Sequence, residues 1–180
     1  MRKVVLSAAL TVAALGVSIS AQKVTDLGTG KGGSPHVRAE SMIDGATIAI
    51  EYGRPGLKGR TPGKDVDPYE GKEWRTGADE QTTLITDKAL KFGTLSLPAG
   101  RYGLHTIPMT GTWQLIISKR PKGWGVPYPA GEDLGRVAMT MGQAPKADEW
   151  LTISIEDTAK GGLLHIDWGT TRASIPFTVG

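Results

Sequence analysis

Apolar and polar residues alternate with a period of two along most of the chain. The alternating segments lie within residues 47–52, 82–86, 90–97, 101–106, 112–117, 137–141, 150–155, 163–168 and 173–179. Such alternation is typical of strands with one face toward a core and one face partly toward water. No window of 11 residues shows a helical stripe. The pattern therefore predicts short antiparallel strands and no helix longer than about three turns.

Turn residues separate the predicted strands. The chain of 180 residues holds 25 Gly and 11 Pro. Many short strands with this density of turns favour an all-β fold, an antiparallel sandwich or a partly open barrel. Two connections, residues 53–81 and 120–136, are much longer than ordinary loops. Connections of that length in a compact domain are usually functional or disordered, and the large aromatic residues in these two argue against disorder.

The first 21 residues have the pattern of a secretory signal peptide. Arg2 and Lys3 precede an apolar stretch from Val4 to Ile19, and Ser20-Ala21 offers a small-residue cleavage position. The apolar stretch is shorter than the roughly 20 residues that span a bilayer. We therefore expect export to the periplasm or the extracellular space, with no transmembrane segment in the mature chain. A flexible Gly-rich leader is expected over residues 22–33 and a single β domain over residues 34–180.

Composition narrows the possible partners. There is no Cys, so the exported domain is expected to have no disulfides. Without Arg2 and Lys3 the 21 Lys and Arg fall to 19, against 18 Asp and Glu, which gives no electrostatic argument for binding nucleic acid. Phosphate-binding loops, dinucleotide fingerprints and nucleophile elbows are absent from the sequence. We predict no cofactor, and the sequence leaves the oligomeric state open.

A set of motifs in fixed order carries a family resemblance. The motifs are Ser34-Pro35, Tyr52-Gly53-Arg54-Pro55, Lys58-Gly59-Arg60, Pro68-Tyr69, Trp74-Arg75-Thr76-Gly77-Ala78, Leu97-Pro98-Ala99-Gly100 with Tyr102, Ile107-Pro108, Trp113, Trp124-Gly125 with Tyr128, and Arg136. Together they resemble an exported bacterial family known as domain of unknown function 2911. The resemblance implies export and a β-rich fold but no reaction. The family usually has Asn at the position of Asp79, so Asp79 departs from the family pattern. The segment Thr61-Pro62-Gly63 departs from it as well.

Basic residues gather in the first long connection. Arg54, Lys58 and Arg60 follow a predicted strand, and Arg75 comes later in the same connection. If these side chains converge, they form a fork suited to a carboxylate or phosphate. The alternative is structural: Arg54 and Arg75 bond loop carbonyls and pair with Glu51, Asp79 or Glu80.

Aromatic residues mark a second candidate surface. Trp124 and Tyr128 lie in a Gly/Pro-rich loop where the strand alternation does not account for them. Aromatic rings held in this way can stack on sugar rings or cationic groups. Trp113 fits the alternation instead and is expected in the core. We expect any ligand to contact the loop around Trp124 and Tyr128.

Three residues are candidates for catalysis, although the sequence assigns no reaction. His105 lies on the strand face opposite Tyr102 and Leu104, and Asp79 and Glu80 are possible general bases. Adjacent strand residues point to opposite faces, so a direct pair of these carboxylates is not expected. His165 shares a strand face with Asp167, which is positioned to orient it. The spacing of the three His matches no metal motif, and no metal site is predicted.

The leading interpretation is an exported binding module for a small polar or carbohydrate-like ligand, or for an envelope partner. Its ligand-binding candidates are Arg54, Arg75, His105, Trp124 and Tyr128. One alternative is a hydrolase or metal-dependent enzyme that uses His105, Asp79 and Glu80. Another is a structural envelope protein without a ligand. Whether these side chains share one concave site distinguishes the three.

Overall fold

The computed structural model describes residues 22–180, all of them in strands, turns and loops. The predicted signal peptide lies outside these residues. The strands are β1 (Lys23–Thr29), β2 (Pro35–Ile43), β3 (Ala46–Gly53), β4 (Ala78–Thr86), β5 (Leu90–Phe92), β6 (Leu95–Leu97), β7 (Gly100–Met109), β8 (Thr112–Ser118), β9 (Asp133–Thr158) and β10 (Gly161–Val179). The predicted all-β class is confirmed. Within the described part of the chain there is no helix of the length and apolarity needed to cross a membrane.

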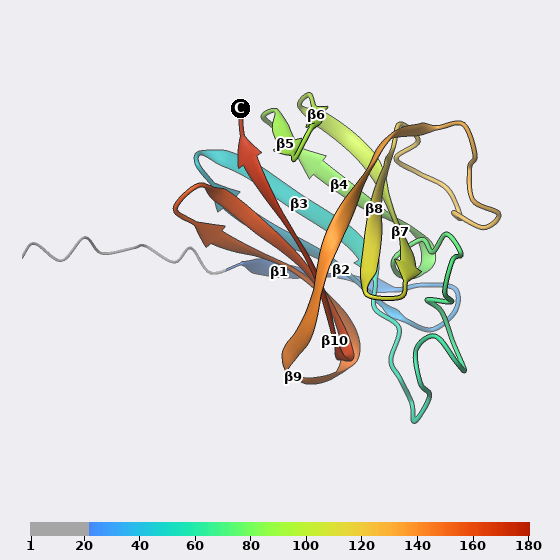
Figure 1. The fold of residues 1–180 in the computed structure, drawn as a ribbon. Helices are drawn as coiled ribbons and strands as arrows, with labels where there is room; N and C mark the ends of the chain where they lie inside the picture. The colour runs from blue at the N-terminus through green and yellow to red at the C-terminus, as the bar shows by residue number, and fades with distance from the viewer. Residues whose placement is uncertain (1–21) are drawn as a thin grey trace, which may run out of the picture.

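All ten strands belong to one antiparallel sheet in the order β1-β2-β3-β4-β7-β8-β9-β10-β5-β6. The edge strands β1 and β6 do not pair with each other, so the sheet stays open rather than closing into a barrel. It folds over on itself through β9 and β10, the two long strands that cross in Figure 1. The first part of β9 pairs with β8, and its second part pairs with the first part of β10.

A bend in β10 at Gly169 brings its two halves face to face. Gly169 has a φ of 59°, in the left-handed region that glycine adopts without steric cost. Asp167 bonds Arg172 across the bend, and His165 bonds Ser174 farther from it. The side chains that meet across the bend are thus polar, whereas the alternate residues Leu164, Ile166 and Ile175 lie on the other face of the strand, in the core.

The core lies between the folded-over parts of the sheet. From β3 the alternate residues Ile48, Ile50 and Tyr52 point inward, and Ile153 and Ile155 of β9 face them. The Tyr52 hydroxyl accepts a hydrogen bond of 2.9 Å from the backbone N–H of Ile153. This bond joins the two layers, because a tyrosine side chain reaches across a core that apolar side chains fill.

Two strands, β1 and β2, lie where the apolar pattern of the sequence predicts none. Residues 23–29, assigned to the Gly-rich leader, form β1 and pair with β2, although every one of them is exposed. The mobility of this segment stays a prediction. In β2 the inward residues include Ala39 and Ser41, whose small side chains hide the alternation. Segments 137–141 and 150–155, predicted as separate strands, are parts of the single strand β9.

Candidate functional site

The loop between β8 and β9 lies across the outer face of β4 and β7. The carbonyl groups of Arg120, Pro121 and Gly123 accept bonds from the Gln81 side chain, the Thr83 hydroxyl and the Gln81 backbone N–H, respectively. Gly103 of β7 lies directly beneath, where an added Cβ would come within 2.5 Å of the Arg120 carbonyl. The loop thus covers a strand face that would otherwise be open to water. In Figure 1 it is the yellow and gold loop at the right.

His105 is buried beneath this loop. It lies on the face opposite Tyr102 and Leu104, as predicted, but it is 0% exposed. Neither ring nitrogen has a hydrogen-bond partner among the described residues, and the same holds for the Gln81 side-chain carbonyl. Burial lowers the pKa of His105 from 6.5 to about 4. The negative charge of Asp133 raises this pKa in part, and the positive charge of Arg75 lowers it further. The ring is therefore neutral near pH 7, with one donor and one acceptor without a protein partner.

Gly125 is the point where the loop touches the strands most closely. Its φ is 73°, and an added Cβ would lie 2.8 Å from Cβ of Gln81, 3.0 Å from Cβ of Arg75 and 3.3 Å from Nε2 of His105. A side chain at this position would push the loop away from His105. A glycine is needed here both for its backbone conformation and for this close approach.

Two aromatic side chains flank Gly125. Trp124 is 46% exposed. The guanidinium of Arg75 lies 4.9 Å from the centre of the Trp124 ring, and its Nη1 donates a hydrogen bond to the Trp124 backbone carbonyl at 3.0 Å. The Tyr128 ring meets His105 edge-on at 5.0 Å between centres. The Tyr128 hydroxyl donates to the Asp133 carboxylate, and burial raises the pKa of Tyr128, with this bond adding to the effect.

Four of the five ligand-binding candidates therefore meet in one place. Arg75, His105, Trp124 and Tyr128 surround Gly125, although they come from two loops and from β7. A cavity of about 240 Å³ opens beside them, lined by Gln81, Arg120, Trp124, Gly125, Val126, Pro127, Tyr128 and Pro129. We call this cavity with its four candidate residues the loop site. The sequence predicts these four residues as ligand-binding candidates, but it does not predict that Gln81 lines the same cavity.

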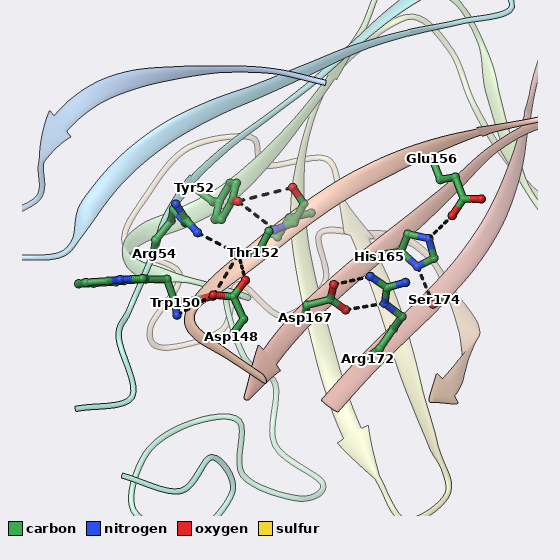
Figure 2. A network of polar contacts seen from close by, with 11 residues as sticks. Tyr52, Arg54, Asp148, Trp150, Thr152, Glu156, His165, Asp167, Arg172 and Ser174 are labelled. Carbon is green, nitrogen blue, oxygen red and sulfur yellow. Dashed lines mark hydrogen bonds and ion pairs between the residues drawn. The ribbon is translucent and has the colours of Figure 1, made fainter. Parts of the chain in front are cut away.

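Arg54 lies elsewhere. Its Nε donates to the Leu151 carbonyl at 2.9 Å. Its Nη2 donates to the Thr152 hydroxyl at the same distance, as Figure 2 shows. Arg54 thus ties the end of β3 to β9. The suggested pairing of Arg54 or Arg75 with Glu51, Asp79 or Glu80 is wrong. Glu51 forms ion pairs with Arg38 and Arg101, and the other two carboxylates lie near His36.

The three catalytic candidates do not share a site. The Asp79 carboxylate accepts from the Gly32 backbone N–H at 2.6 Å and lies 3.1 Å from Nε2 of His36. Glu80 is exposed and lines a different cavity, although its carboxylate lies 3.9 Å from the same Nε2 of His36. His105 contacts neither carboxylate, and Asp79 holds the turn before β2. In the described part of the chain, no group of three or more His, Asp or Glu side chains is arranged to bind a metal ion.

A chain of polar contacts joins β9 and β10 at residues that the sequence pattern does not bring together. Nδ1 of His165 lies 2.8 Å from the Ser174 hydroxyl, and its Nε2 lies 3.2 Å from Glu156 (Figure 2). The expected orienting partner, Asp167, forms two bonds with Arg172 instead. Only the bend at Gly169 brings His165 and Ser174 together, and no spacing rule could reveal it. The three residues lie away from the loop site, and none of them lines its cavity.

Comparison with protein families agrees with the motifs. A family model described as "Protein of unknown function (DUF2911)" matches residues 34–177, which confirms the resemblance. The matched range runs from before β2 to near the end of β10 and includes both long loops. Searches of curated proteins and of solved structures find no match.

Proposed function

Because the chain belongs to the DUF2911 family, whose description names no activity, we propose a function from geometry: an exported, non-enzymatic module that binds a small polar ligand at the loop site. Export is proposed from the pattern of residues 1–21 alone. Mass spectrometry of the secreted fraction tests this part. A mature chain beginning at about residue 22 supports it, and an intact Met1 would contradict it.

One observation carries the proposal. A fully buried, neutral His105 without hydrogen-bond partners lies beneath a loop that presents an exposed Trp. Buried polar groups without partners destabilise a fold by about 1–3 kcal/mol each, so they are uncommon unless they serve a purpose. Here the exposed ring offers a stacking surface, and the groups beneath it offer hydrogen bonds.

The polar groups suggest the ligand class. A neutral imidazole supplies one donor and one acceptor, and the Gln81 carbonyl supplies a further acceptor. Hydroxyl groups satisfy donors and acceptors alike, and a sugar ring has an apolar face that stacks on Trp. A carbohydrate-like ligand fits this combination better than a wholly apolar one. Reaching His105 requires the loop to lift at Gly125.

Tryptophan fluorescence during a screen of neutral oligosaccharides, peptides and organic acids tests the proposal. A ligand of the loop site should change the emission of the wild type, and the Trp124→Ala variant should bind it at least about tenfold more weakly. Met42→Ala is the matched control, because Met42 is also a large exposed apolar side chain but lies on β2, outside the loop site. A ligand that binds all three proteins equally would contradict the proposal, as would a screen in which nothing binds.

A further inference from the structure

A second cavity lies on the other side of Arg75. It has a volume of about 320 Å³ and lies between the turn before β2, the connection from β3 to β4, and Trp150 of β9. Three cationic side chains line it: Lys58, Arg60 and Arg75. We call it the basic cavity. It shares Arg75 with the loop site and none of the other residues that define that site.

The three cations have no carboxylate within ion-pair distance. No ion pair within 4.0 Å involves Lys58, Arg60 or Arg75 in the described residues, whereas Arg38, Arg101, Arg136 and Arg172 all form one. Arg60 donates from Nε and Nη2 to the carbonyls of Leu57 and Gly56, which holds its guanidinium in place without neutralising it. Burial lowers the pKa of Arg75, because its charge is partly removed from water.

Two carboxylates, Asp79 and Asp67, also line the basic cavity, and neither neutralises its cations through an ion pair. Asp79 is 4% exposed and already accepts from Gly32 and bonds His36. Asp67 is exposed to solvent, so its attraction for Arg75 is screened by water. Among the lining residues, three cations against two carboxylates leave an excess of one positive charge. A third carboxylate, that of Glu149, accepts from the Lys58 backbone N–H at 2.7 Å beside the cavity, but it is exposed and its charge is screened by water.

The backbone around the basic cavity is held in an uncommon conformation. Lys58, Thr76 and Asp79 have φ values of 50°, 55° and 63°, in a region that costs a non-glycine residue about 1–3 kcal/mol. Thr76 is β-branched, which makes its conformation the least expected of the three. Its hydroxyl bonds that of Thr106 at 3.1 Å, and its carbonyl accepts from Thr82 at 2.8 Å. These contacts fix Arg75 and Asp79 on either side of it, as a preformed site requires.

Trp150 supplies an aromatic wall. It is 36% exposed, and Gly56 packs so closely against it that an added Cβ would lie 3.0 Å from the ring. A flat ring beside unneutralised cations suits a ligand that has an anionic group and a face that can stack.

We propose that the basic cavity binds a small oxyanion, a carboxylate or a phosphate group, between Lys58, Arg60 and Arg75. This site is additional to the loop site and shares with it only Arg75, whose guanidinium also contacts Trp124. The guanidinium groups bind the oxygens by charge-assisted hydrogen bonds, and Lys58 adds a mobile charge at the entrance. Salt weakens the binding because Lys58 and Arg60 are exposed.

Isothermal titration of the mature protein with sodium phosphate and, separately, with sodium succinate tests the inference. Lys58→Asn should weaken binding about tenfold, because Asn tolerates the positive φ but lacks the charge. Lys64→Asn is the matched control, since Lys64 lies nearby but lines a neighbouring cavity. Thermal melts of both variants report whether the fold is intact.

The outcomes separate this site from the loop site. The inference is supported if either anion binds, if Lys58→Asn weakens this binding, and if Lys64→Asn leaves it within about twofold. Trp124→Ala should weaken it less than Lys58→Asn does, because Trp124 contacts only Arg75 of the three cations. The anion that binds identifies phosphate or carboxylate as the group recognised. Failure of both anions to bind overturns it and leaves the loop site untouched. Binding that only Trp124→Ala weakens also overturns it and assigns the anion to the loop site.

Discussion

Charged side chains on the strands and charged side chains in the long loops have different partners. On β2, β3 and β7, Arg38 pairs with Glu40 and Glu51, and Arg101 pairs with Glu51. On β10, Arg172 pairs with Asp167 through two bonds. In the loop before β4, by contrast, Arg60 and Arg75 bond to backbone carbonyls.

This difference separates structural from functional candidates. A guanidinium paired with a carboxylate is neutralised, so it contributes to the fold and attracts ligands weakly. A guanidinium bonded only to carbonyls is held in position while its charge stays available to an anion. The long loops therefore combine positional order with unneutralised charge, which favours them over the strand faces as the place where a ligand binds.

The largest expected effect concerns His105 and acid. Its pKa is about 4 in the folded chain and 6.5 in the ordinary state, so the unfolded chain binds more protons between these values and stability falls as pH falls. This one group should cost about 3 kcal/mol of unfolding free energy between about pH 7.5 and pH 4. Denaturant melts at several pH values measure the loss, and His105→Gln should remove it. An unchanged pH dependence in His105→Gln would mean that the ring is not held neutral.

Next comes a direct comparison of two arginines. Arg172→Ala leaves Asp167, which is 7% exposed, without its partner and should lower the unfolding free energy by about 2 kcal/mol. Arg75→Ala removes one bond to a carbonyl and one ring contact and should cost about 1 kcal/mol. Urea melts of the two variants give the comparison. Equal losses would contradict the distinction between the strand charges and the loop charges.

A smaller effect is expected at the bond that joins the two layers. Tyr52→Phe leaves the backbone N–H of Ile153 without its acceptor in the core, at a cost of about 1–2 kcal/mol. Tyr102→Phe is the control, because that hydroxyl donates to the Pro98 carbonyl near the surface and its loss should matter less. Denaturant melts test both variants. A larger loss for Tyr102→Phe would show that the Tyr52 bond does not hold the layers together.

The smallest effect on stability is expected at Trp124. Because nearly half of its surface is exposed, Trp124→Ala should change the unfolding free energy by about 0.5 kcal/mol or less. The same variant is expected to weaken ligand binding strongly. Thermal melts beside the fluorescence titration separate the two quantities. A destabilised Trp124→Ala would indicate that the ring serves the fold.

The alternation of apolar residues was sufficient to predict the class and most of the strands. Ile48, Ile50, Leu104 and Leu115 point inward where the pattern places them, because a strand with one buried face requires a period of two. It could not predict β1, whose residues are all exposed and carry no such pattern. The alternation also could not predict that β9 and β10 fold over. In a bent strand the apolar and polar residues of each part alternate in the same way as those of two separate strands.

For the candidate sites, the sequence indicated which residues to consider, but it did not indicate which other residues each of them contacts. Arg75, Trp124 and Tyr128 stood out because strand alternation did not explain large or charged residues in loops. The contact of Gly125 with His105 depends on how a loop crosses a strand face, and the pairing of Asp79 with His36 joins residues 43 apart in the chain. Such contacts follow from tertiary structure, which local spacing does not encode.

Amide chemical-shift mapping tests the central claim most directly. Two-dimensional NMR spectra of the 15N-labelled protein, recorded during titration with a ligand from the fluorescence screen and with phosphate, locate each binding site by residue. The account predicts shifts confined to the two long loops at residues 53–81 and 119–132, the strand residues beneath them, the turn at residues 32–34 and Trp150, with the neutralised ion pairs on β2, β3 and β10 unaffected. Shifts centred on those ion pairs, with the two long loops unchanged, would contradict it.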